Sequence, residues 1–211
     1  MYNQIKSRQR VADHGEVFTN EREVNAMLDL VKAETERIDS RFLEPACGDG
    51  NFLAEILRRK LEVVRKKYSR SKLDYERNAV AAACSIYGVE LLADNVEVCR
   101  RRMFEIWDKE YSNICKNEAN DDTREAVHFI FERNIQCGDA LTMHTDKGEP
   151  IVFSEWSFIT RNQVQRRDYI FEKLLNREQS DNVQQTLLDD QDGGELLRRY
   201  VTDYRKVHKY E

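Results

Sequence analysis

The sequence has few of the residues that interrupt regular structure: two prolines, Pro45 and Pro150, and eight glycines among 211 residues. Because these residues punctuate helices and strands, their scarcity predicts long helices. A run of about 18 apolar residues, which a membrane-spanning helix needs, is also missing. The polar residues 1–9 contain no apolar signal-peptide core. We therefore expect a cytoplasmic protein that does not bind a membrane.

Paired cysteines are missing as well, because the five cysteines are scattered and none forms a Cys-x-x-Cys pair. This spacing argues against a zinc site and against a disulfide framework, so we expect no metal. Charged residues make up 35% of the chain and the net charge is −5, which argues against DNA binding by the whole surface. Four basic residues gather within 161–173, and this cluster is either a solvated face or a phosphate-contacting surface.

Hydrophobic spacing predicts the secondary structure. The expected helices are 20–36, 51–68, 72–84, 93–111, 121–133, 163–176 and 194–207. The expected strands are 41–44, 86–90, 135–137 and 150–158. Alternating strands and helices predict an α/β fold whose mainly parallel sheet is flanked by helices. We expect one domain over residues 1–160, followed by a C-terminal helical segment over 161–211 that packs on it or extends it.

Residues 42–53 carry the strongest functional signal, reading Phe-Leu-Glu-Pro-Ala-Cys-Gly-Asp-Gly-Asn-Phe-Leu. A strand leads into a turn with Gly48 and Gly50, and an amphipathic run opens at Phe52. A strand, a glycine turn and a helix in this order place bare backbone N–H groups and a helix N-terminus beside a ligand.

Other nucleotide-binding loops fit this stretch less well. A dinucleotide-binding turn needs a third glycine where Leu53 stands, and a P-loop needs a Gly-Lys-Ser/Thr run that is absent. Asp49 would repel a pyrophosphate but suits a cationic ligand. The order Glu-Pro-Ala-Cys-Gly-x-Gly-x-Phe resembles the cofactor loop of N6-adenine DNA methyltransferases of restriction-modification systems, which use S-adenosyl-L-methionine (SAM). This resemblance implies a Rossmann-like methyltransferase fold.

Two further acidic residues follow the next two strands. Glu90 ends the strand 86–90, and Asp139 lies in Cys-Gly-Asp-Ala-Leu after the strand 135–137. Ligands of parallel sheets bind at the carboxyl ends of the strands, so we expect both acids beside the glycine turn. The resemblance implies that Glu90 binds the ribose hydroxyls and that Asp139 accepts from the adenine amino group. The alternatives are a surface acid at a strand end and an ordinary turn.

The resemblance covers about residues 14–143 and includes an N-terminal motif, Gly-Glu-Val-Phe-Thr, that ends at Thr19. Asn20 stands where the family usually has proline, and Thr19 can equally be a helix cap. The cofactor-binding residues that the resemblance implies are Thr19, Glu44, Pro45, Ala46, Cys47, Gly48, Gly50, Phe52, Glu90, Leu91, Asp139 and Ala140.

The catalytic motif of this family, Asn/Asp-Pro-Pro-Tyr/Phe at the end of the fourth strand, is absent, because no two prolines are adjacent. At the expected distance after Asp139, residues 152–158 read Val-Phe-Ser-Glu-Trp-Ser-Phe instead. Glu155, as an acceptor for an amine, and Trp156, as a surface for a base, are the remaining candidates, although a tryptophan in a strand is usually buried. We expect the sheet to stop after this fourth strand, leaving an edge at 151–158 that a partner subunit or a second copy covers.

Three functions stay open. The first is a subunit of an N6-adenine DNA methyltransferase that needs a protein partner for activity and meets DNA through the complex. The second is a non-catalytic SAM-binding regulator or assembly protein derived from a methyltransferase. The third is a methyltransferase that acts on something other than DNA through Glu155 or Trp156.

Overall fold

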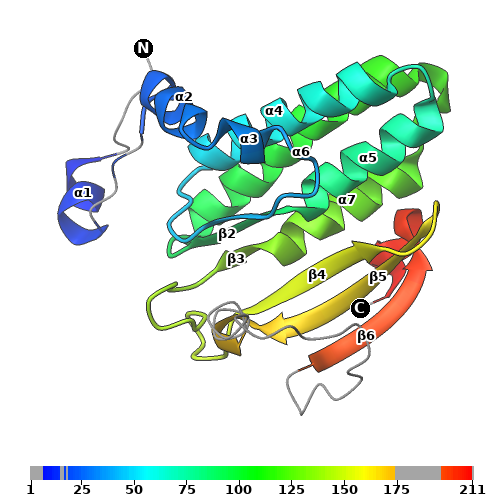
Figure 1. Ribbon diagram of the computed structural model, residues 1–211. Coiled ribbons are helices and arrows are strands. Elements are labelled where there is room, and N and C mark those ends of the chain that lie inside the picture. Colours follow the sequence, from blue (N-terminus) through cyan, green and yellow to red (C-terminus); the bar gives the residue numbers. More distant parts are fainter. Residues whose placement is uncertain (1–6, 15–16, 18, 174–195, 211) are drawn as a thin grey trace.

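The computed structural model describes residues 7–14, 17, 19–173 and 196–210. Its described part is a mixed α/β structure with two three-stranded sheets (Figure 1). The helices are α1 (Arg8–His14), α2 (Glu21–Asp29), α3 (Lys32–Thr35), α4 (Asn51–Tyr68), α5 (Lys72–Cys84), α6 (Ala93–Cys115) and α7 (Asp121–Asn134), with the 3-10 helices η1 (Lys116–Glu118) and η2 (Tyr204–Lys209). The strands are β1 (Phe42–Glu44), β2 (Ile86–Glu90), β3 (Ile135–Cys137), β4 (Val152–Phe158), β5 (Gln163–Ile170) and β6 (Leu196–Asp203). Within these ranges no helix combines the length and apolar character that a membrane span requires.

The first sheet is parallel, with the strand order β1-β2-β3. Phe42 pairs with Ile86, and Gly88 pairs with Ile135. Helices α4 and α5 connect β1 to β2, and α6 and α7 connect β2 to β3. The prediction of an α/β fold with a parallel sheet flanked by helices is therefore confirmed, and the arrangement is compatible with a Rossmann-like fold. Since all three strands run the same way, their carboxyl ends meet at one edge.

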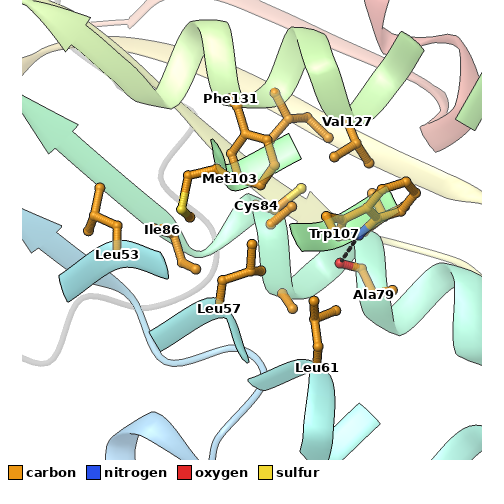
Figure 2. Close-up of a cluster of buried hydrophobic side chains, with 14 of the residues drawn as sticks. Leu53, Leu57, Leu61, Ala79, Cys84, Ile86, Met103, Trp107, Val127 and Phe131 are labelled. Carbon is orange, nitrogen blue, oxygen red and sulfur yellow. Dashed lines mark hydrogen bonds between the residues drawn. The ribbon is translucent and has the colours of Figure 1, made fainter. Parts of the chain in front are cut away.

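The core lies between this sheet and its helices (Figure 2). Leu53, Leu57 and Leu61 recur every fourth residue of α4, which places them on one face. All three are fully buried or nearly so, and Trp107 of α6 is buried with them. The indole Nε1 of Trp107 donates to the carbonyl oxygen of Ala79 at 3.0 Å, so this polar atom is satisfied inside the core.

The predicted helix over 20–36 is two helices, because α2 ends at Asp29 and α3 begins at Lys32. No proline or glycine marks this break in the sequence. Asn20 caps the start of α2, since its side chain accepts from the backbone N–H of Glu23 at 3.0 Å. The helix predicted over 93–111 extends to Cys115.

The fourth strand does not continue the parallel sheet. β4 pairs antiparallel with β5, and β5 pairs antiparallel with β6, in the order β4-β5-β6. The helices predicted over 163–176 and 194–207 are therefore wrong for residues 163–170 and 196–203, which form β5 and β6. Residues 171–173 are helical and 204–207 belong to η2, while 174–195 lie outside the described residues. The segment predicted to be helical over 161–211 thus consists, in its described part, of two strands with helical residues only at 171–173 and in η2. Its expected boundary at residue 160 falls in the turn between two paired strands.

A buried ion pair explains why β5 resembles a helix in sequence. Arg166 and Asp168 lie two residues apart, on the same face of the strand, and both are buried. The guanidinium donates to both carboxylate oxygens at 2.7 Å. Charged residues at buried positions hide the alternation of apolar and polar residues by which a strand is recognised. The helix prediction for β5 therefore failed because charged residues occupy buried strand positions that are usually apolar.

The second sheet packs against α7, as Figure 1 shows. Asn134, at the end of α7, joins the two sheets: its Oδ1 accepts from Trp156 Nε1 at 2.9 Å, and its Nδ2 donates to the carbonyl of Ile86 at 3.1 Å. The Tyr87 hydroxyl of β2 also donates to the carbonyl of Ser154 in β4, at 3.0 Å. Trp156 is only 7% exposed. The Trp156 ring is therefore buried in the chain's own fold, whereas β4 is an outer strand of the second sheet, so a partner along 151–158 stays a prediction.

Candidate functional site

A cavity of about 580 Å³ lies at the carboxyl ends of β1, β2 and β3. Eleven of the twelve residues implied by the resemblance line it, and the exception is Gly50. Asp49, whose charge suits a cationic ligand, also lines the wall. Six further residues of the wall were not predicted from the sequence: Val17, Asn51, Leu92, Asn95, Gly138 and Leu141. Most of these lie one or two positions from a residue that the resemblance implies, so their closeness to the motifs could have predicted them. Landmarks spread from Thr19 to Ala140 in sequence thus meet at one cavity.

The glycine turn has the conformation that its sequence predicts. Gly48 has φ +53° and Gly50 has φ +89°, both in the left-handed region that side chains disfavour. A Cβ atom on Gly50 would lie 2.7 Å from the sulfur of Cys99 in α6. Gly50 therefore shapes the site through close contact with α6, although it does not face the cavity.

The N-terminus of α4 opens beside this turn. Its N-cap is Gly50, which has no side chain to accept from the first amides, and the first turn carries no acidic residue. Asn51 and Phe52, the first two residues of the helix, line the cavity. Helix N-termini carry unpaired N–H groups and a partial positive charge, which favour an anionic group. A carboxylate of a ligand would fit at this end of the cavity.

Asn51 holds the Thr19 segment in place. Its Nδ2 donates to the backbone carbonyl of Thr19 at 3.0 Å, and its Oδ1 accepts from Arg102 at 2.6 Å. Thr19 lines the cavity, whereas Asn20 provides the side-chain cap of α2. The alternative in which Thr19 serves as the helix cap is therefore wrong.

Glu90 is buried at the end of β2, with 8% of its surface exposed, so it is not a surface acid. Its Oε2 accepts from the backbone N–H of Gly48 at 2.9 Å. Its Oε1 accepts from the N–H of Leu92 at 3.0 Å and from Asn95 Nδ2 at 3.3 Å. An ionised carboxylate has about four acceptor positions, so these bonds leave capacity for a further donor. Glu90 ties the glycine turn to β2, and its binding of ribose hydroxyls stays a prediction.

Asp139 lies in the cavity wall and also shapes a turn. Its Oδ1 accepts from the backbone N–H of Leu141 at 2.8 Å, and its carbonyl accepts from Met143 at 2.7 Å. The two interpretations offered by the sequence are thus compatible, since the turn places Asp139, Ala140 and Leu141 along the cavity.

The charge of the cavity is of one sign. Glu44, Asp49, Glu90 and Asp139 line it, and no lysine, arginine or histidine is among the described residues of its wall. Burial raises the pKa of Glu44 above its usual value. Carboxylates near one another in a partly buried site attract cations and hydroxyl donors and repel phosphates. The wall therefore suits a ligand with a positive centre and hydrogen-bond donors.

Apolar side chains complete the wall. Leu91 and Leu141 are 55% and 92% exposed, values that place them at the mouth of the cavity, and Phe52 and Ala140 line it as well. A flat aromatic ring can bury its faces against such side chains while its edge meets polar groups.

The two catalytic candidates do not belong to this site, because neither Glu155 nor Trp156 lines the cavity. Glu155 pairs with Arg41 and with Arg167. The Trp156 ring packs against Phe129 and beneath the guanidinium of Arg166. Both side chains therefore have structural roles in the second sheet. Comparisons with protein-family models, curated proteins and solved structures found no match for this chain.

Proposed function

We propose that the cavity at the carboxyl ends of β1, β2 and β3 binds SAM, and that the chain is a partner-dependent subunit of an N6-adenine DNA methyltransferase. The observation that carries this proposal is the convergence of eleven motif residues on one cavity. The volume of about 580 Å³ lies within the range of roughly 300–1,000 Å³ common for small-molecule sites.

The residues of the wall suit each part of this cofactor. The N-terminus of α4 and the Thr19 segment would hold its carboxylate, and the acidic wall would favour its ammonium and sulfonium groups. Glu90 would accept from ribose hydroxyls, and Asp139 from the adenine amino group, with Leu91 and Ala140 beside the ring. When bound, SAM supplies an electrophilic methyl group.

A partner enters the proposal because the described residues of the cavity wall do not include the family's catalytic tetrapeptide. Methyl transfer to an exocyclic amine needs acceptors that align the amine and draw its protons. A partner subunit would supply these acceptors and the surface that recognises DNA. The ion pairs of Glu155 and the burial of Trp156 favour a second candidate, a non-catalytic SAM-binding regulator. A methyltransferase that uses these two residues on another substrate has no geometric support.

Calorimetry with SAM and S-adenosylhomocysteine tests the binding proposal. We expect both to bind, and Asp139→Asn to weaken binding about tenfold, because an amide is a poorer acceptor than a carboxylate. Asn keeps an oxygen for the Leu141 amide, so the turn should survive. Asp146→Asn, an exposed change outside the cavity wall, is the control with the same loss of charge. Absence of heat with either ligand on folded protein would remove the proposal.

Transfer of a tritiated methyl group to adenine-containing DNA separates the two candidates. The subunit proposal expects no transfer by the chain alone and transfer when a neighbouring gene product that carries an Asn-Pro-Pro-Tyr motif is added. The regulator proposal expects SAM binding without transfer in either case.

A further inference from the structure

A second cavity, of about 410 Å³, lies on the antiparallel sheet and has the opposite charge. Its wall brings together three arginines, one aspartate and two apolar side chains: Arg133, Arg166, Arg198, Asp168, Val152 and Leu197. They come from the last turn of α7 and from β4, β5 and β6. None of them lines the acidic cavity.

The guanidinium of Arg166 forms hydrogen bonds with the residues around it, and Arg166 is 1% exposed. Besides its two bonds to Asp168, it donates to the Ser154 hydroxyl at 3.1 Å and to the Tyr200 hydroxyl at 2.7 Å. Its guanidinium also lies 5.4 Å from the centre of the Tyr200 ring. The Arg166–Asp168 ion pair is a structural element of the sheet, and the Asp168 carboxylate neutralises the charge of Arg166.

Arg133 and Arg198 then leave an excess of positive charge in the described wall of the cavity. Arg133 Nη2 lies 3.9 Å from Asp168 Oδ2, longer than a hydrogen bond, and Arg198 stands opposite Asp168 in the ladder of β5 and β6. Arg133 Nε is buried and makes no hydrogen bond to a described residue. Burial and the charge of Arg166 both lower the pKa of Arg133. Among the described residues of the wall, one carboxylate faces three guanidinium groups.

We propose that this cavity binds a phosphate group between Arg133 and Arg198. Guanidinium groups present paired N–H donors that match phosphate oxygens, and an anion here would neutralise the charge that Asp168 leaves uncompensated. The phosphate belongs either to a nucleic-acid backbone or to a free phosphorylated molecule. This inference makes no use of the proposed SAM site, and it gives Arg166, within the basic cluster of 161–173, a structural role beside the phosphate.

Titration with inorganic phosphate tests the site directly on the full chain. We expect saturable binding that Arg133→Gln with Arg198→Gln weakens by about tenfold or more, since hydrogen bonds to charged groups are lost. Arg70→Gln with Arg101→Gln is the matched control, because it removes the same charge from exposed positions outside the cavity wall. Arg198→Gln alone alters an exposed side chain and keeps the Arg166–Asp168 pair, so it tests the site even if the double variant fails to fold.

Fluorescence anisotropy with a labelled DNA duplex separates the two sources. If the cavity variants weaken DNA binding and the control does not, the phosphate is that of a nucleic-acid backbone. If they weaken only the binding of inorganic phosphate, the ligand is a free phosphorylated molecule. If Arg198→Gln binds both probes as tightly as the control variant, or if neither probe binds the unaltered chain, the proposal is overturned.

Discussion

At the scale of single residues, Gly50 and Gly148 form a natural comparison. Both have positive φ, +89° and +77°, but a Cβ atom on Gly50 meets the sulfur of Cys99 at 2.7 Å, whereas a Cβ atom on Gly148 meets nothing within 4 Å. Gly148→Ala should cost about 1 kcal/mol of unfolding free energy, the price of the backbone conformation alone. Gly50→Ala should cost roughly 1–3 kcal/mol more, because it also overpacks the contact with α6. Urea unfolding measures both, and equal losses would show that Cys99 moves aside.

Glu90 supports a second prediction at this scale. Replacing it by Gln leaves one acceptor for the N–H groups of Gly48 and Leu92, and turns an NH₂ group toward one of these donors. Glu90→Gln should lower the free energy of unfolding by about 2 kcal/mol and weaken SAM binding about tenfold. Glu97→Gln, at an exposed position of α6, is the control and should change neither quantity. Unchanged unfolding with weakened binding would mean that Glu90 serves the ligand and not the loop.

Sequence reasoning could bring the motif residues to one cavity because their positions are encoded locally. Each named residue follows a strand end or opens a helix, and parallel strands bring those ends to one edge. What sequence spacing could not supply was the set of partners across the site. That Glu90 accepts from Gly48, or that Asn51 reaches Thr19, depends on how the segments pack.

At the scale of helices and strands, the predictions held where hydrophobic periodicity was clear. α4 and α5 were placed correctly from their apolar faces, and β2 from its apolar run. They failed for β5 and β6, in which arginines occupy strand positions. An amphipathic pattern made by charges and aromatic rings cannot be told from a solvated helix without knowing which charges pair.

The junction between the sheets depends on Asn134, which is fully buried and bonds Trp156 on one side and Ile86 on the other. Asn134→Ala would leave an indole N–H and a strand carbonyl without partners. We expect a loss of about 3 kcal/mol in unfolding free energy, with changed Trp156 fluorescence. Asn113→Ala, at an exposed position of α6, is the control. A loss no larger than that of the control would show that packing alone holds the sheets together.

At the scale of the whole molecule, the two cavities carry opposite charge and share no residue. If both proposals hold, S-adenosylhomocysteine and phosphate should stabilise the chain independently. Each ligand at a concentration of 100 Kd should add about 2.7 kcal/mol to the free energy of unfolding, and the two contributions should sum. Unfolding with each ligand and with both measures this. If the stabilisation measured with both ligands differs from the sum of the two separate values by more than about 1 kcal/mol, the two sites are coupled through α7 and Asn134.

The two sheets also differ in how far apart along the chain their paired residues lie. In β4 and β5, Phe158 pairs with Val164 across a short turn, whereas Phe42 and Ile86, or Gly88 and Ile135, are separated by pairs of long helices. Contacts between distant residues form slowly, because the chain must first close a large loop. The β4–β5 hairpin is therefore expected to form early and the parallel sheet late. The acidic cavity then exists only after the last strands have met, so ligand binding reports the completion of folding.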